Sequence, residues 1–160
     1  MKPLFLTAML VLPLAAQSPV PTPALTANGA FFALSVPDRT ASTRWYREKL
    51  GLQVIMDAPR SDQTRASVTV LRGGGLTVEL VQHDDAAPRQ AQRPDRSGAM
   101  FVHGIAKVGV QVEDFDAALA NLRARGVDIA MGPFPKHADQ PANVIIRDNA
   151  GNLIQILGKP

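Results

Sequence analysis

The chain has no cysteine, and only one tryptophan and one tyrosine among its 160 residues. The missing cysteines exclude disulfide bonds, thiolate metal ligands, a cysteine nucleophile and a lipid-modified N-terminal cysteine. The formal net charge is only +3, and the lysines and arginines are scattered along the chain. Nucleic-acid-binding proteins need a basic stripe, usually with aromatic side chains that stack on bases. This sequence has neither, so we expect no nucleic-acid partner.

Apolar residues, by contrast, are plentiful. They make up 46% of the chain, which is enough to build a hydrophobic core. At this length the chain forms one domain or two fused half-domains.

The N-terminus is typical of a secretory signal peptide. A short basic start, Met1-Lys2, is followed by an uncharged apolar run that ends in small residues at Ala15 and Ala16. The run is shorter than the roughly 20 apolar residues of a membrane span. We therefore predict a signal peptide over residues 1–16, a periplasmic or secreted protein, and no membrane association after cleavage. An uncleaved anchor is the alternative. Residues 17–29, which contain Pro19, Pro21 and Pro23, read as an extended linker.

The rest of the chain, residues 30–158, repeats one plan. Modules 30–82 and 104–158 each predict a strand, a helix and three further strands, and segment 83–103 joins them. Equivalent positions are 76 residues apart, as Phe31 is from Lys107 and Glu79 is from Gln155. We expect helices over 39–50 and 115–125, each preceded by an aspartate suited to cap it. The expected strands are 31–36, 52–56, 65–71, 76–82, 107–112, 127–131, 144–147 and 153–157.

Two turns have a specific reading. Gly132-Pro133-Phe134-Pro135 is expected to end the strand at residue 131, and Asp148 is expected to shape the turn over residues 148–152.

Alternation along the predicted strands separates two sheet faces. One face is uniformly apolar and should lie under the helices. The other mixes small, polar and charged residues, which makes a poor core but a suitable cavity wall. The mixed face carries Phe31, Ala33, Ser35, Thr77, Glu79, Val81, Lys107, Gly109, Gln111, Leu153, Gln155 and Leu157.

This pattern resembles the vicinal oxygen chelate superfamily, which includes glyoxalase I, extradiol dioxygenases and the bleomycin- and fosfomycin-resistance proteins. The resemblance covers residues 30–157. It implies an α+β fold in which two βαβββ modules form an open, barrel-like sheet around a pocket. The residues that carry it are Val36-Pro37-Asp38, Trp45-Tyr46, Leu50-Gly51, Val78-Glu79-Leu80, Val112-Glu113-Asp114, Gly126 and the run from Arg147 to Gln155.

Metal-using members of the superfamily place His, Glu or Gln at four strand positions, which correspond here to Phe31, Glu79, Lys107 and Gln155. Glu79 is a good ligand and Gln155 a weak one, whereas a phenyl ring cannot bind and an ammonium repels a cation. A divalent ion needs three or more nitrogen or oxygen donors. We therefore expect no metal and no other cofactor.

Lys107 takes on a new role if the implied geometry holds. Its ammonium then lies near the vacant ion position with Glu79 as its counter-ion. One reading is a structural ion pair. Another is an anchor for a ligand carboxylate, phosphate or carbonyl, with Gln155, Gln111 and Ser35 adding hydrogen bonds and Phe31 lining the site. A Lys107 base or Schiff base is a third reading.

The leading hypothesis is an exported, glyoxalase-like protein that binds a small organic molecule in a metal-free pocket, for sequestration or for metal-independent catalysis. One alternative is a metal-dependent lyase or dioxygenase of the superfamily. Another is a protein-interaction domain with an occluded pocket. Sequence leaves open whether the protein is an enzyme and whether it is a homodimer. Its three histidines, His83, His103 and His137, share no ligand-type spacing.

Overall fold

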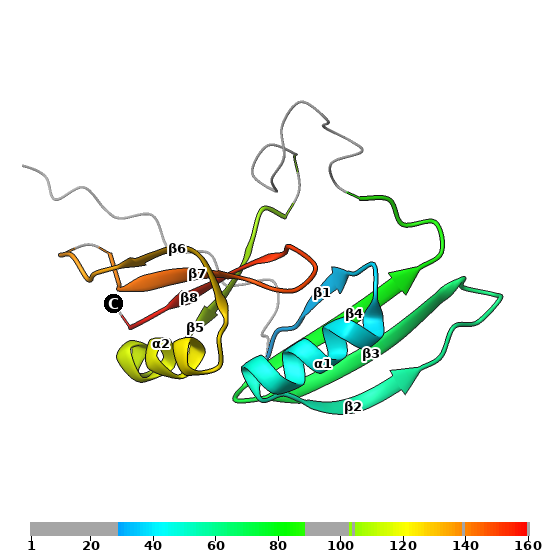
Figure 1. Cartoon of the computed structure of the whole chain (residues 1–160), viewed down its shortest axis with the longest axis horizontal. Helices are drawn as coiled ribbons and strands as arrows, with labels where there is room; N and C mark the ends of the chain where they lie inside the picture. The colour runs from blue at the N-terminus through cyan, green and yellow to red at the C-terminus, as the bar shows by residue number, and fades with distance from the viewer. Residues whose placement is uncertain (1–28, 89–102, 104, 139, 160) are drawn as a thin grey trace, which may run out of the picture.

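Two modules of the same design make up the structure, a computed structural model that describes residues 29–88, 103, 105–138 and 140–159 (Figure 1). The predicted signal peptide, nearly all of the predicted linker and residues 89–102 of the predicted connecting segment lie outside these residues. The first module contains β1 (Phe32–Ser35), α1 (Arg39–Leu50), β2 (Gln53–Ala58), β3 (Ala66–Gly73) and β4 (Leu76–His83). The second contains β5 (Val108–Gln111), α2 (Phe115–Ala124), β6 (Asp128–Phe134), β7 (Asn143–Arg147) and β8 (Leu153–Leu157).

Each module folds its strands into a four-stranded mixed sheet. The strand orders are β1-β4-β3-β2 and β5-β8-β7-β6, so the first strand of each module runs parallel to its last. The predicted α+β fold of two βαβββ modules is thereby confirmed. The two sheets are separate and neither closes into a barrel.

One strand end was predicted wrongly. β6 continues through Gly132 and Pro133 to Phe134, where the sequence predicted a break. A proline removes a backbone donor and usually ends a central strand, but β6 is the edge strand of its sheet, where one N–H faces outward. The register of β6 with β7 is irregular at this point, between Met131 and Phe134.

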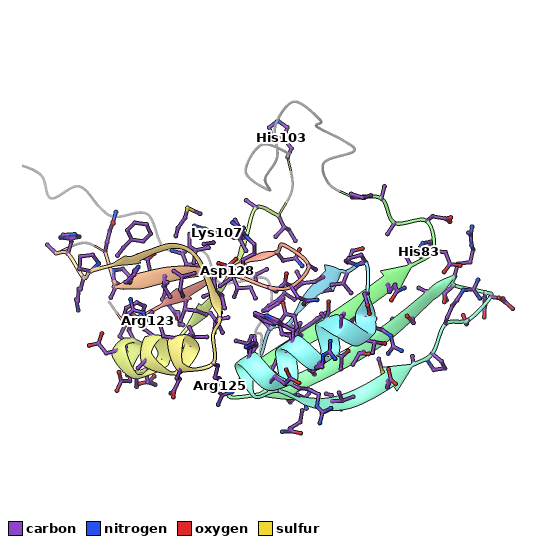
Figure 2. All side chains as sticks on the ribbon, viewed as in Figure 1. His83, His103, Lys107, Arg123, Arg125 and Asp128 are labelled. Carbon is purple, nitrogen blue, oxygen red and sulfur yellow. The ribbon has the colours of Figure 1, made fainter. Side chains whose placement is uncertain are left out.

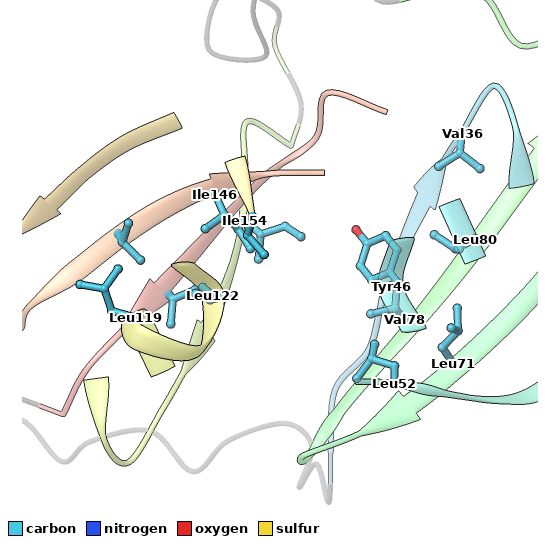
Figure 3. Packing of buried hydrophobic residues seen from close by; sticks show 13 residues of the cluster. Val36, Tyr46, Leu52, Leu71, Val78, Leu80, Leu119, Leu122, Ile146 and Ile154 are labelled. Atoms are coloured by element: carbon cyan, nitrogen blue, oxygen red, sulfur yellow. The ribbon is translucent and has the colours of Figure 1, made fainter. Parts of the chain in front are cut away.

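The predicted caps and core faces are confirmed. The Asp38 carboxylate accepts a hydrogen bond from Ala41 N, and Asp114 accepts one from Ala117 N, both at 2.9 Å. The apolar strand faces pack under the helices as two halves of the core, visible in Figure 3. Leu80 of β4 and Ile154 of β8 are both 0% exposed. Within the part of the chain that the structure describes, neither helix is long and apolar enough to cross a bilayer.

The second module packs on the outer side of α1. The Tyr46 hydroxyl donates to Asp148 Oδ2 at 2.9 Å, and Asn149 Nδ2 contacts Ser42 Oγ at 3.1 Å. Tyr46 and Ser42 are 0% exposed and Asp148 is 4% exposed. Figure 3 shows the Tyr46 hydroxyl directed toward the second module. The helix α1 therefore lies between its own sheet and the turn that joins β7 to β8.

A second contact joins the C-terminal ends of the two helices. The Lys49 ammonium donates to the Arg125 carbonyl, and the Arg125 guanidinium approaches the carbonyls of Glu48 and Lys49 at 3.5 Å. Figure 2 shows Arg125 where the ends of α1 and α2 meet. Cations stabilise helix C-termini, and each of these two side chains contacts backbone carbonyls at the C-terminal end of the helix in the other module. Because Lys49 and Arg125 are themselves 76 residues apart, this exchange indicates a local twofold relation between the modules.

Gly51 makes this junction sensitive to substitution. It ends α1 with a φ of 74°, and an added Cβ would lie 3.3 Å from the Arg125 guanidinium. We predict that Gly51→Ala lowers the free energy of unfolding by about 1–2 kcal/mol, because the left-handed backbone strains any residue with a Cβ and Arg125 is displaced as well. Gly74→Ala is the matched control, because Gly74 has a φ of 55° and nothing within 4 Å. Urea unfolding should give Gly51→Ala a lower free energy of unfolding than Gly74→Ala. Equal losses of free energy in the two variants would contradict a role for the junction.

Candidate functional site

The sheet faces that point away from the helices carry matching rows of side chains. In the first module, strand register aligns Ala33, Glu79, Val70 and Met56 across the sheet. The corresponding row of the second module is Gly109, Gln155, Ile145 and Met131. Each row therefore has a small residue, a central polar residue, a branched aliphatic residue and a methionine.

The two faces do not cover each other within one chain. Ala33 and Ser35 are exposed in the first module, as are Gly109 and Gln111 in the second. Met56 at the edge of the first row is 47% exposed. In the second module Met131 is 36% exposed, whereas Ile145 is buried at 5% exposed, so this face is less open than the first. We call these two surfaces the open faces.

Two shallow hollows lie elsewhere on the molecule. One, of about 220 Å³, lies beside α1 and is lined by Arg44, Arg47, Glu48, Leu52 and Gln53. The other, of about 370 Å³, lies between α2 and the end of β6, where Phe115, Leu119 and Phe134 contribute to its walls. Neither contains a residue of the predicted site. Among the residues that the structure describes, neither of these two hollows joins the open faces.

Glu79 and Gln155 occupy the centres of the two open faces, on β4 and β8, and both are half-buried. The Gln155 side-chain amide donates to Asn143 Oδ1 at 3.0 Å. Ser35 and Gln111 lie at the ends of β1 and β5 and are exposed. These four residues are on the predicted faces.

Phe31 and Lys107 lie just before β1 and β5. Phe31 is 65% exposed, and Lys107 is exposed ahead of its strand, as Figure 2 shows. The ion pairs among the residues that the structure describes do not include one between Lys107 and Glu79. The predicted pairing is therefore not made within the described part of a single chain.

These residues do not fit a divalent metal ion. Within the described ranges, no three His, Asp or Glu side chains converge as ligands. Of the four positions that the resemblance implies, only Glu79 and Gln155 carry donor atoms, and they lie on separate sheets. Two donors, one of them a neutral amide, fall short of the three or more that such ions require.

Several other charged groups of the first module form ion pairs with one another. Hydrogen bonding from Arg39, helped by Thr69, holds the pKa of Asp57 below its usual value. Hydrogen bonding from Arg60 does the same to the pKa of Asp84, which that guanidinium contacts at 2.8 Å. These pairs join neighbouring strands, turns and the start of α1. The open face keeps a cation near its end, Arg72 of β3, which donates to Thr77 Oγ1 at 3.3 Å.

The histidines have local structural contacts. His83 Nδ1 accepts a hydrogen bond from Asp85 N at 3.0 Å, which closes the turn after β4. The backbone of His137 forms an isolated bridge with Gln140. Figure 2 shows His83 and His103 at separate places in the molecule, so neither contact pattern supports a histidine metal site.

Sequence reasoning assigned Asp148 to its turn but missed its second role. The carboxylate does accept from Ala150 N at 2.9 Å and Asn152 N at 2.8 Å, as a turn-shaping residue should. It also receives the Tyr46 hydroxyl from the other module. Burial, reinforced by the adjacent Asp148, raises the pKa of Tyr46 far above its ordinary value. The signal in the sequence was a helix tyrosine that needs a polar partner when buried.

The duplicated βαβββ modules and their matching open faces define a class of two-module α+β proteins. The Glyoxalase/Bleomycin resistance protein/Dioxygenase superfamily model matches residues 30–156, and the chain belongs to this superfamily. No curated protein matches the chain.

Solved structures of the same superfamily share the fold. A glyoxylase/bleomycin resistance protein/dioxygenase domain from Frankia sp. EAN1pec is 20% identical, with a TM-score of 0.65 over 85% of this chain and 100% of that one. TnmS3, an antibiotic binding protein from Streptomyces sp. CB03234, is 20% identical, with a TM-score of 0.56 over 85% and 100%. The fosfomycin resistance protein FosX from Listeria monocytogenes is 12% identical, with a TM-score of 0.58 over 83% and 94%. At these identities the likeness concerns the fold.

Proposed function

We propose that this protein binds a small organic molecule on its open faces without a resident metal ion, either to sequester it or to transform it. The observation that carries the proposal is the pair Glu79 and Gln155, one polar group at the centre of each face amid small and apolar side chains. Binding sites for small molecules typically combine an apolar lining with a few polar groups in this way. Two proteins of similar structure, an antibiotic binding protein and a fosfomycin resistance protein, agree with a small-molecule ligand.

A second copy of the chain completes the site in this proposal. Neither of the two hollows lined by described residues lies on an open face, and the second module contacts the first through α1. The open faces and their margins also carry large apolar side chains that are well exposed, which is typical of surfaces that take a partner. These residues are Phe31, Val54, Ile55, Met56, Ile105 and Met131. In the homodimer, the first-module face of one copy meets the second-module face of the other.

The remaining predicted residues take positions at the margin of this shared site. Ser35 and Gln111 supply hydrogen-bonding groups at the ends of their strands, and Phe31 supplies an aromatic wall. Lys107 supplies a positive charge at the mouth, where its exposure lets it meet groups that reach the solvent.

The oligomer is tested by charge placed on the faces. We predict that Met56→Lys and Met131→Lys together convert a dimer into a monomer, because two buried ammonium groups per interface are strongly unfavourable. Light scattering after size exclusion gives the mass. The matched control is Ala117→Lys with Ala120→Lys, which adds the same charge at two exposed α2 positions and should leave the dimer intact. A wild-type monomer at high concentration would contradict the shared site.

The metal is tested by elemental analysis. The full-length protein, exposed to zinc, nickel, iron and manganese and then desalted, should retain less than about a tenth of an equivalent of each, since two donors hold such ions weakly. If the wild-type protein retains one equivalent of any of these metals and Glu79→Gln does not, the metal-free site is contradicted. That result would support a metal-dependent lyase or dioxygenase.

Export is the remaining part of the proposal and rests on the sequence of residues 1–16. N-terminal sequencing of protein recovered from the periplasm or the medium should read from Gln17. Protein that stays in the cytoplasm with Met1 intact would contradict export.

A further inference from the structure

Glu79 differs from the other acidic residues of its module. Residues 29–88 contain seven of them, and five have a polar partner: Asp38, Asp57, Asp62, Asp84 and Asp85. The other two are Glu48, exposed on α1, and Glu79, half-buried on the open face. Glu79 has no hydrogen-bond or ion-pair partner among the residues that the structure describes.

The immediate neighbours of Glu79 do not contact its carboxylate. Its cross-strand neighbours are Ala33 and Val70, and Val81 lies two residues further along β4 on the same face. None of these three side chains can donate a hydrogen bond. The nearest donors on the face are Thr77 and Arg72, which contact each other at 3.3 Å. A carboxylate that is partly withdrawn from water without a donor or a cation is unfavourable, and a bound group that supplies both relieves the penalty.

The equivalent position in the second module also presents an acceptor. The Pro141 carbonyl can only accept, so the Asn143 amide must turn its Nδ2 toward it, at 3.2 Å. Asn143 Oδ1 is then left to face Gln155 and accepts from Nε2 at 3.0 Å. This chain of contacts fixes the Gln155 amide and leaves its Oε1 as the atom available to a ligand.

From these two observations we infer that the ligand is an organic amine, whose protonated nitrogen lies against Glu79 and donates to Gln155 and whose apolar body lies on the open faces. The inference deepens the proposed function and rests on it. An ammonium offers three donors and a positive charge, which matches a carboxylate and a free amide oxygen. Val70 and Val81 provide a rigid apolar surface, and Met56 and Met131 provide adaptable walls for bodies of different shape.

This ligand class differs from the one implied by the reading of Lys107 as an anchor for a carboxylate, phosphate or carbonyl. That reading placed the Lys107 ammonium at the centre of the site, paired with Glu79. Lys107 is instead exposed ahead of β5, and the central groups on both faces are acceptors.

Three probes that share one ring and differ in one group test the inference: para-fluorobenzylamine, para-fluorobenzyl alcohol and para-fluorobenzoate. Fluorine NMR titrations against the full-length chain measure their affinities. We expect the amine to bind about tenfold or more tightly than the alcohol, and the benzoate to bind most weakly. Glu79→Gln should lower the amine affinity by about tenfold or more and leave the alcohol unchanged. Gln155→Leu should lower the amine affinity severalfold.

Glu48→Gln is the matched control, since it removes the other unpaired carboxylate of the module from a position outside the face. It should leave the amine affinity at the wild-type value. The melting temperature of Glu79→Gln should not fall, because no contact within the described residues is lost.

The outcomes separate the two levels of the proposal. Preference for the benzoate, or an amine affinity that Glu79→Gln leaves unchanged, overturns the amine and keeps small-molecule binding. Amine binding that appears only in the Lys107→Met variant also overturns the amine inference. It would mean that, in the wild-type protein, the Lys107 ammonium of a second copy pairs with the Glu79 carboxylate. If none of the three probes binds, the amine and the proposed small-molecule site both fail.

Discussion

Replacing Asp148 by alanine should lower the free energy of unfolding by about 3–5 kcal/mol. The carboxylate is 4% exposed and accepts hydrogen bonds from Ala150 N, Asn152 N, the Asn152 amide and the Tyr46 hydroxyl. The substitution removes all four and leaves the Tyr46 hydroxyl buried without an acceptor, which costs more than the loss of an average hydrogen bond. Urea unfolding followed by Trp45 fluorescence measures the change, since Trp45 is the sole tryptophan and its ring lies 4.9 Å from that of Tyr46.

Two further variants serve as comparisons for Asp148→Ala. Tyr46→Phe should cost only about 1–2 kcal/mol, because Asp148 keeps its three donors within the turn. Asp128→Ala should change stability by less than about 1 kcal/mol, because its contact with Arg147 is a 3.8 Å ion pair at the surface. If Asp148→Ala were no more harmful than Asp128→Ala, the buried link between the modules would not exist in solution.

The second large effect appears at alkaline pH. The pKa of Tyr46 in the folded protein is raised by burial and by Asp148, whereas an unfolded tyrosine titrates near pH 10. Below that pH both states hold the proton, and the stabilisation is complete. As the pH rises above about 10, the unfolded state releases the proton and the folded state keeps it, so the free energy of unfolding should fall by about 1.4 kcal/mol per pH unit. Tyr46→Phe should lack this component.

The chain offers a direct readout for this titration. Tyr46 is the only tyrosine, so tyrosinate absorbance reports this residue alone. The absorbance should rise only together with the change in Trp45 fluorescence that marks unfolding. Tyrosinate that forms near pH 10 in a protein whose tryptophan signal is still native would show that the hydroxyl reaches water.

Much of the fold could be predicted from the sequence because it depends on local sequence patterns that occur in both modules. The aspartates at 38 and 114, the glycine at 51 and the alternation along β4 and β8 each predict a feature that the structure contains. The end of β6 was missed because the effect of Pro133 depends on whether its strand is central or at the edge, and strand order is a property of the whole sheet.

The candidate site could be predicted from the sequence only in part, for a related reason. Parity along the strands assigned Glu79 and Gln155 to the same kind of face in each module, and the structure agrees. Whether those faces meet depends on how the modules pack. That packing is decided by contacts such as Tyr46 with Asp148, which are 102 residues apart and carry no shared local pattern. The predicted pairing of Lys107 with Glu79 assumed a meeting that the single chain does not make.

Mixing two binding-deficient variants tests the central claim, that the faces bind a ligand between two copies. Glu79→Gln damages one face, Gln155→Leu damages the other, and the mixed dimer is isolated by different affinity tags on the two chains. If each site joins faces from different copies, one site of the mixed dimer carries both changes and the other carries neither. Fluorine NMR with para-fluorobenzylamine should then recover about half of the wild-type binding capacity at wild-type affinity. A mixed dimer that binds no better than its parent variants would mean that each chain builds its site alone, and would contradict the account.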